Sequence, residues 1–154
     1  MPQTETARRK PHGVLFFVVV FAVVVIATLL FRNKPGIAWI EDYQAGLQKS
    51  AQLNKPALIC FYFKNGPFTS AMRRGTWQDS RVVAFVDKNF VPILLSIDDN
   101  PELTKNYGAG YDGACFIRLP DGTQSDQATH GNRPPLEYIE KLQAKLTELT
   151  SKKP

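Results

Sequence analysis

The sequence contains only two cysteines and two histidines, and this scarcity excludes several kinds of site. Cys60 and Cys115 lie far apart in the chain, and neither belongs to a Cys-x-x-Cys pair. His12 and His130 stand equally alone, so no group of cysteines and histidines has the spacing of a zinc ligand set. We therefore expect the chain to bind no metal and no cofactor.

Acidic residues are fewer than basic ones, 14 against 19, which gives a net charge of +5. The excess lies near the N-terminus, at Arg8, Arg9, Lys10, Arg32 and Lys34. From residue 37 onward the two signs nearly balance. A domain that binds nucleic acid needs a basic stripe on its folded part. We therefore expect no nucleic-acid partner.

Charge is missing altogether from residues 13–31, GVLFFVVVFAVVVIATLLF. As a helix this run is about 28 Å long, against a hydrocarbon core of roughly 30 Å, so we predict that it spans the lipid bilayer. A cleaved signal peptide has a shorter apolar region that ends in small residues, whereas this run ends in Leu-Leu-Phe and indicates an uncleaved signal-anchor. A buried core helix would keep a polar face, which this run lacks.

Three basic residues precede the span and two follow it, and cytoplasmic flanks of membrane helices are enriched in Lys and Arg. We therefore predict a single-pass membrane protein with a cytoplasmic N-terminus and a globular domain on the periplasmic or extracytoplasmic side. The predicted organisation is a short basic tail (1–12), a transmembrane helix (13–32), a linker (33–38), a globular domain (39–150) and a C-terminal tail (151–154).

Beyond the linker, the apolar pattern predicts alternating helices and strands. Continuously apolar runs rich in β-forming residues predict buried strands at 57–63, 91–97 and 114–119. A Pro-Asp-Gly turn at 120–122 predicts a hairpin into a polar edge strand that ends near Thr129. Helical spacing predicts a first helix with Ile40 on its apolar face and a last helix that begins at 134–135. This order indicates an α/β fold with a mixed sheet flanked by helices.

The order and spacing of these segments resemble the thioredoxin-like family over roughly residues 38–150. The matching pieces are the leading helix, the strand ALICFYF, the turn and helix GPFTSAM, the strand and helix FVPILLSIDDNPELTKNYGA, the hairpin ACFIRLPDG and the last helix GNRPPLEYIEKL. The resemblance implies a sheet with helices on both faces and a site at the turn before GPFTSAM.

The residues that the family uses for redox chemistry are absent from this turn. The family motif Trp-Cys-Gly-Pro-Cys aligns with Lys64, Asn65, Gly66, Pro67 and Phe68. A buried acid that many members keep would fall at Ile59, and the proline that forms a cis bond in the facing loop would fall at Gly113. Disulfide exchange needs an activated thiolate and a second thiol, and this aligned segment offers neither.

These losses favour a membrane-anchored, redox-inactive domain that is not an enzyme and that binds or positions a protein partner. In the family, the turn and the facing loop receive an extended peptide. The expected partner surface is therefore the turn, residues 64–68, together with a facing loop of Tyr111, Asp112, Gly113 and Ala114.

Two alternatives remain open from the sequence. The first is a thiol-dependent oxidoreductase or peroxidase-type enzyme that uses Cys115, Cys60 or a bound small thiol such as glutathione. We expect these two cysteines to be small buried apolar residues, and a disulfide between adjacent strands is the alternative. The second is a subunit that packs within a membrane complex through residues 13–31.

Overall fold

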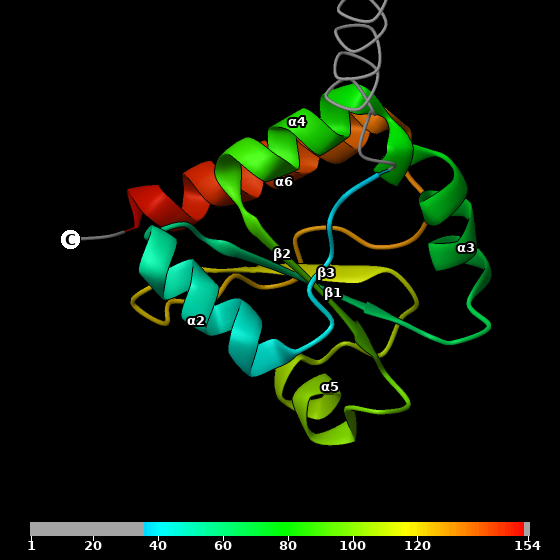
Figure 1. Cartoon of the computed structure of the whole chain (residues 1–154), viewed down its shortest axis with the longest axis horizontal. Coiled ribbons are helices and arrows are strands. Elements are labelled where there is room, and N and C mark those ends of the chain that lie inside the picture. The colour runs from blue at the N-terminus through cyan, green and yellow to red at the C-terminus, as the bar shows by residue number, and fades with distance from the viewer. Residues whose placement is uncertain (1–35, 153–154) are drawn as a thin grey trace, which may run out of the picture. The chain divides into compact units, whose positions relative to one another are not determined.

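The computed structural model describes residues 36–152, which fold into helices around a three-stranded sheet (Figure 1). The elements, in chain order, are α2 (Tyr43–Leu53), β1 (Ala57–Tyr62), α3 (Pro67–Arg74), the short 3-10 helix η1 (Thr76–Gln78), α4 (Ser80–Asn89), β2 (Val91–Ser96), α5 (Pro101–Tyr107), β3 (Ala114–Arg118) and α6 (Pro135–Ser151). The N-terminal tail and the predicted membrane span lie outside the described residues. Within residues 36–152, no helix is both long and apolar enough to cross a membrane.

The sheet has the strand order β2-β1-β3, so β1 is central and β3 lies at an edge. β1 pairs with β2 in parallel and with β3 antiparallel. The register places Cys60 of β1 opposite Leu94 of β2 on one side and opposite Cys115 of β3 on the other. The prediction of a mixed sheet flanked by helices is confirmed.

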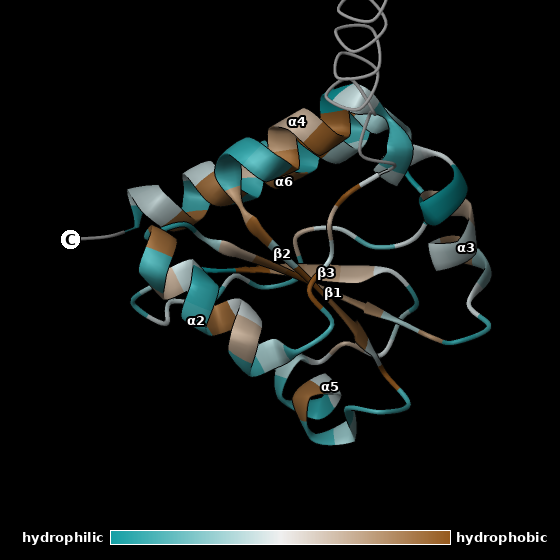
Figure 2. Cartoon of the chain, viewed as in Figure 1, coloured by the Kyte–Doolittle hydropathy of each residue, from teal (hydrophilic) through white to brown (hydrophobic). Residues whose placement is uncertain are grey.

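Alternate residues along the strands enter two separate cores, because side chains of a strand point to opposite faces of the sheet. On one face, Leu58, Cys60 and Leu94 pack with buried side chains of α3, η1, α4 and α6. On the other face, Ile59 and Phe61 join a core that α2 and α5 cover. Figure 2 shows the strands as the most apolar part of the domain, with polar residues on the outward sides of the helices.

Two helices begin where the sequence places a capping carboxylate. Asp42 accepts a hydrogen bond from the Ala45 amide at 2.7 Å and starts α2, while Asp79 accepts one from the Arg81 amide at 2.9 Å and starts α4. Asp42 also explains why the prediction that Ile40 lies on a helix is wrong. Ile40 precedes this cap, and its main chain bonds to Pro92 and Leu94 beside β2.

The predicted edge strand after the hairpin is reduced to two isolated bridges, Arg118 with Gln124 and Cys115 with Thr129. At Ile117 the amide donates to the Ser125 hydroxyl at 2.9 Å instead of to a main-chain carbonyl, which interrupts the regular ladder. Residues 123–129 therefore follow β3 closely without forming a continuous strand.

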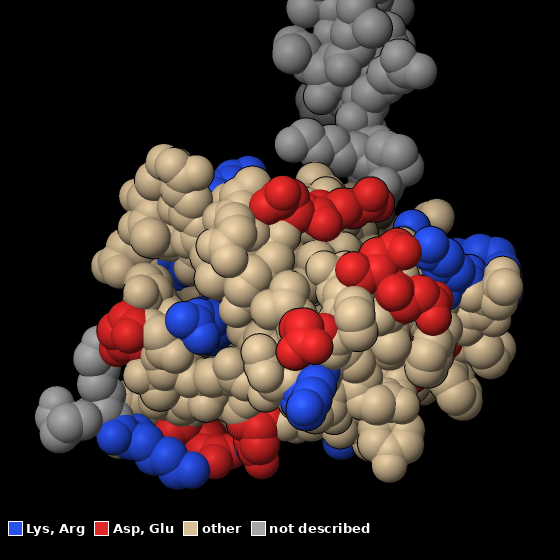
Figure 3. Space-filling model, turned by 90° about the horizontal axis from the view of Figure 1, so that it is seen from below, with Lys and Arg blue, Asp and Glu red and all other residues tan. Residues whose placement is uncertain are grey.

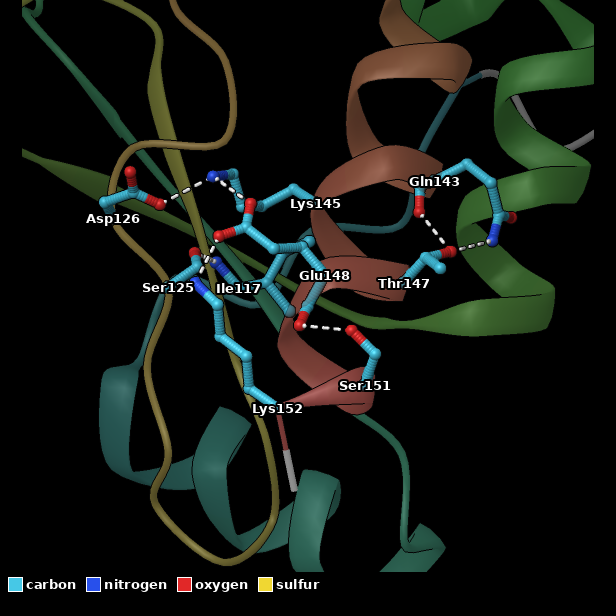
Figure 4. A network of polar contacts seen from close by, with 9 residues as sticks. All are labelled: Ile117, Ser125, Asp126, Gln143, Lys145, Thr147, Glu148, Ser151 and Lys152. Carbon is cyan, nitrogen blue, oxygen red and sulfur yellow. Dashed lines mark hydrogen bonds and ion pairs between the residues drawn. The ribbon is translucent and has the colours of Figure 1, made fainter. Parts of the chain in front are cut away.

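A group of charged side chains joins α6 to this segment (Figure 4). Lys145 of α6 contacts Asp126 at 2.7 Å and Glu148 at 2.6 Å, and Lys152 contacts Glu148 at 2.6 Å. Both lysines lower the pKa of the Glu148 carboxyl to about 2 through hydrogen bonds and charge attraction. On the face of the domain that Figure 3 shows, acidic and basic side chains are interspersed.

Candidate functional site

Cys60 and Cys115 form a disulfide that joins β1 to β3. They are directly opposite in the antiparallel register, and their Cα atoms are 4.0 Å apart. The Cys115 amide donates to Thr129 and its carbonyl accepts from Ala128, so both groups point away from β1. Cys115 therefore occupies a non-hydrogen-bonded position relative to β1, where facing side chains approach most closely.

The expectation that the two cysteines are separate buried thiols is wrong, since they are bonded to each other. The prediction of a redox-inactive domain that is not an enzyme is contradicted by the same observation. A disulfide is a couple that can accept two electrons, and it needs no Cys-x-x-Cys spacing when the fold brings two strands together. The sequence placed both cysteines on neighbouring strands, but it did not fix the register that makes them face each other.

The disulfide lies in the core between the sheet and α6. Both cysteines have 0% exposure, and Tyr138 of α6, which is 1% exposed, lies against them. Its hydroxyl oxygen is 3.9 Å from the Cys60 Sγ and 3.8 Å from the Cys115 Sγ. Burial raises the pKa of Tyr138, while the nearby Trp77 indole acts in the opposite direction. The phenol therefore stays protonated and can donate a weak hydrogen bond to either sulfur.

Two further polar groups lie beside Cys115. The carbonyl oxygen of Gly113 is 3.6 Å from the Cys115 Sγ. Thr129 is paired with Cys115, so the two side chains share one face of the sheet. The Thr129 hydroxyl is buried and has no hydrogen-bond partner among the described residues. Sequence reasoning missed Tyr138 and Thr129, and the signal for Tyr138 was a tyrosine one helical turn before Leu142 on the apolar face of the last helix.

The predicted turn and facing loop do lie together, and Asp112 joins them. Its buried carboxylate accepts hydrogen bonds from the amides of Phe63, Phe68 and Thr69 at 3.0 to 3.2 Å. It also accepts one from the Thr69 hydroxyl at 2.6 Å. The negative charge thus caps the N-terminus of α3, where free amides and the helix dipole favour an anion.

Gly66 leaves the space that this carboxylate occupies. A Cβ atom at Gly66 would lie 2.1 Å from the Asp112 Oδ2, far inside van der Waals contact. Gly113, at the position of the family proline, has a φ of +76°, and the described residues contain no cis peptide bond. The facing loop therefore has, at Gly113, a left-handed backbone conformation that favours glycine. The Asp112 carboxylate of the same loop fills the space beside Gly66 in the aligned motif.

The other predicted residues of the turn lie at the surface of this joined region. Lys64 is exposed and pairs with Asp99 at 2.8 Å, and this hydrogen bond raises the pKa of its ammonium group. Asn65 and Pro67 are exposed, whereas Ala114 is buried.

Exposed aromatic side chains flank a cavity of about 310 Å³ beside the facing loop. Phe68 is 51% exposed and Tyr111 is 66% exposed. Phe68, Tyr111, Asp112 and residues 130–133 line the cavity. A Cβ atom at Gly113 would lie 3.4 Å from the Gly131 amide nitrogen, so the chain passes closely between this cavity and Cys115. The cavity therefore borders the segment that leads directly to the disulfide.

No known protein-family description matches this chain, and no curated protein matches it either. Solved structures do match. The oxidised C-terminal domain of DsbD from Neisseria meningitidis has a TM-score of 0.60 at 22% identity, over 70% of this chain and 99% of that chain. A thioredoxin from Thermus thermophilus has a TM-score of 0.65 at 18% identity, over 75% of this chain and 92% of that chain.

A putative disulphide-isomerase from Bacteroides thetaiotaomicron has a TM-score of 0.62 at 18% identity, over 73% of this chain and 94% of that chain. The three proteins share the arrangement of helices and sheet with this chain, although their sequences differ widely. The described domain has a thioredoxin-like fold.

Proposed function

We propose that this protein is a thiol–disulfide oxidoreductase whose redox-active pair is Cys60 and Cys115. The observation that carries the proposal is the disulfide itself, which joins two strands of a thioredoxin-like sheet. The similar DsbD domain has been solved in oxidised and in reduced forms, and another similar protein is described as a putative disulphide-isomerase. These neighbours support the choice of chemistry.

The proposed reaction exchanges one disulfide for another with a dithiol substrate. A substrate thiolate attacks one protein sulfur and forms a mixed disulfide, while the second protein sulfur leaves as a thiolate and takes up a proton. The second substrate thiol then attacks the mixed disulfide. The substrate ends as a disulfide and the protein as two thiols, so two electrons and two protons have moved from substrate to protein. A partner with a lower reduction potential than the protein drives this direction.

We propose that the substrate is a protein thiol that docks at the turn 64–68 and the facing loop 111–114. Phe68 and Tyr111 offer exposed aromatic surface beside the cavity, which suits an apolar peptide side chain. Since both sulfurs are buried, reaction requires the segment between this cavity and Cys115 to open.

We also propose that residues 13–31 anchor the protein in a bilayer, with the N-terminus cytoplasmic and the domain on the periplasmic or extracytoplasmic side. The uncharged run and the basic residues before it support this arrangement. Disulfides persist in oxidising compartments, which fits a domain outside the cytoplasm.

The function is tested by reduction of the purified full chain with dithiothreitol under native conditions, followed by thiol counting and circular dichroism. We expect both thiols to appear while the domain remains folded. The reduced protein should then speed the reduction of insulin disulfides, which is the same exchange in the reverse direction. A variant with Cys60→Ala and Cys115→Ala should have no such activity. A disulfide that opens only when the domain unfolds would overturn the proposal and make the bond purely structural.

The docking surface is tested with Phe68→Ala against Leu53→Ala. Leu53 is 52% exposed on α2, so the two substitutions remove similarly exposed apolar side chains from different places. We expect Phe68→Ala to lower the rate with insulin several-fold while dithiothreitol reduces both variants alike. Equal insulin rates in the two variants would exclude this surface.

A further inference from the structure

The two sulfurs of the disulfide differ in the side from which a thiolate can approach them. Attack on a disulfide occurs in line with the S–S bond, from the side opposite the leaving sulfur. For Cys115 this direction leads beyond β3, where Ala128 and Thr129 bond to it in an isolated bridge. For Cys60 it leads across β2, whose residues 91–96 are all buried. A continuous buried strand therefore covers the side of Cys60, whereas an isolated bridge covers the side of Cys115, and this difference favours approach to Cys115.

The cavity beside the facing loop is lined by residues from both segments that flank Cys115. It is lined by Tyr111 and Asp112, which shortly precede Cys115, and by His130 and Gly131, which directly follow Thr129. Gly113 and Gly131 meet there without side chains between them. The chain around Cys115 is therefore the part of the disulfide's surroundings nearest to a place where a substrate can bind.

The polar groups around the sulfurs also differ. The Gly113 carbonyl near Cys115 can only accept a hydrogen bond, so it favours a protonated thiol there and disfavours a thiolate. The Tyr138 hydroxyl lies 3.9 Å from the Cys60 Sγ and 3.8 Å from the Cys115 Sγ, so it can donate a hydrogen bond to either sulfur. The buried Thr129 hydroxyl has no hydrogen-bond partner among the described residues, so it makes no hydrogen bond to the Cys115 sulfur. The Gly113 carbonyl is thus the group that distinguishes the two sulfurs, and it makes a thiolate less favourable on Cys115 than on Cys60.

We infer that a substrate thiolate attacks Cys115, that Cys60 leaves as the thiolate, and that the Tyr138 hydroxyl donates the hydrogen bond that stabilises this leaving sulfur. This inference rests on the proposed function and specifies its site. In the first step the bond between the substrate sulfur and the Cys115 Sγ forms as the Cys60–Cys115 bond breaks. The electron pair of the broken bond stays on Cys60.

The order of the sulfurs is tested on the wild-type full chain with reduced glutathione as the probe. The reaction is quenched at short times with excess maleimide in denaturant, and the peptides are mapped by mass spectrometry. We expect glutathione on Cys115 and maleimide on Cys60 in the same molecules. Glutathione found mainly on Cys60 would overturn the assignment. This experiment needs no substitution, so it does not depend on whether a variant folds.

The role of Tyr138 is tested by the rate at which dithiothreitol reduces the native disulfide in Tyr138→Phe. Loss of a hydrogen bond to a charged sulfur should slow reduction by about tenfold. Tyr107→Phe is the matched control, because it removes a buried hydroxyl that bonds to Tyr43 on the opposite face of the sheet. We expect the control to react at the wild-type rate.

A folded Tyr138→Phe protein that is reduced as fast as wild type would overturn the role of the hydroxyl. A structural role alone would change the unfolding midpoint and not this rate. If the wild-type disulfide resists reduction until the domain unfolds, the proposed function itself fails. If it is reduced in the folded protein but Cys60 carries the glutathione, only the present inference fails.

Discussion

The turn before α3 and the disulfide between β1 and β3 are two regions of one fold that both differ from what the family resemblance implies. The turn occupies the position of the family's cysteine motif, yet a carboxylate from the facing loop fills it. Strands β1 and β3 lie in the core, and they hold the sulfur pair. The two cysteines are thus paired by the fold at a place other than the aligned motif.

The difference has a physical basis in access and solvation. At a helix N-terminus a thiolate is exposed and is stabilised by amides and the helix dipole. Here those amides donate hydrogen bonds to Asp112, so they stabilise a carboxylate of the folded domain instead of a thiolate. The sulfurs in the sheet are shielded from water, and the Tyr138 hydroxyl contacts both of them. The comparison predicts that the two regions respond differently to substitution.

The largest effect should come from removing the disulfide by Cys60→Ala together with Cys115→Ala. The bond closes a loop with a sequence separation of 55, so its loss should lower the free energy of unfolding by about 4 kcal/mol. Denaturant unfolding without reductant measures this difference, and added reductant should remove most of it. Equal stability of wild type and variant without reductant would show that the disulfide does not stabilise the domain.

Asp112→Ala should have the next largest effect, because it leaves three amides and a hydroxyl without their acceptor. We expect a loss of about 3 kcal/mol in the free energy of unfolding. Asp99→Ala is the control, since it removes an exposed carboxylate that pairs with Lys64. A small effect of Asp112→Ala would show that the turn does not depend on this cap.

Gly66→Ala should destabilise the domain by about 2 kcal/mol, because the new methyl group would overlap the Asp112 carboxylate. Gly66 has a φ of −68°, so its backbone is suitable for alanine and the effect reports packing alone. Gly110→Ala is the control, as nothing lies within 4 Å of a Cβ atom there.

The double variant Gly66→Ala with Asp112→Ala sharpens this test. If the methyl group acts through the carboxylate, the combined loss in stability should be smaller than the sum of the two single losses. An additive result would mean that Gly66 is required for another reason.

The smallest effect should come from Glu148→Gln in the group of charges that joins α6 to residues 123–129. The folded protein lowers the Glu148 pKa from 4.5 to about 2, so the carboxylate contributes stability above pH 4.5 and this contribution is lost as the pH falls toward 2. The variant should therefore be slightly less stable than wild type at neutral pH. The two unfolding curves should converge in acid, and a constant difference across that range would contradict the assignment.

Much of the fold could be predicted because its elements have local signals. The carboxylate of Asp79, the proline at the start of α3 and the apolar runs of the three strands all act within a few residues. The cap at Asp42 is equally local, but it was missed, and the first helix was therefore predicted to begin too early. The edge strand near Thr129 was not predicted correctly, because the Ser125 hydroxyl replaces a main-chain acceptor across the sheet. That hydrogen bond depends on which segment lies beside β3 in the folded domain, and local sequence patterns do not show this.

The candidate site was predicted less well for the same reason. The turn 64–68 and the loop 111–114 were correctly placed together by the resemblance, but their connection through Asp112 could not be seen in the sequence. The inference from the missing motif also failed, since it treated sequence spacing as the only way to pair two cysteines.

The sequence by itself determined the helices, the strands and the apolar character of both cysteine positions, because short-range periodicity and caps specify them. Only the tertiary structure decided that Cys60 faces Cys115, that Asp112 fills the turn and that Tyr138 lies over the sulfurs. Each of these contacts joins residues far apart in the chain, and strand register and helix packing, which no local signal encodes, bring them within bonding distance.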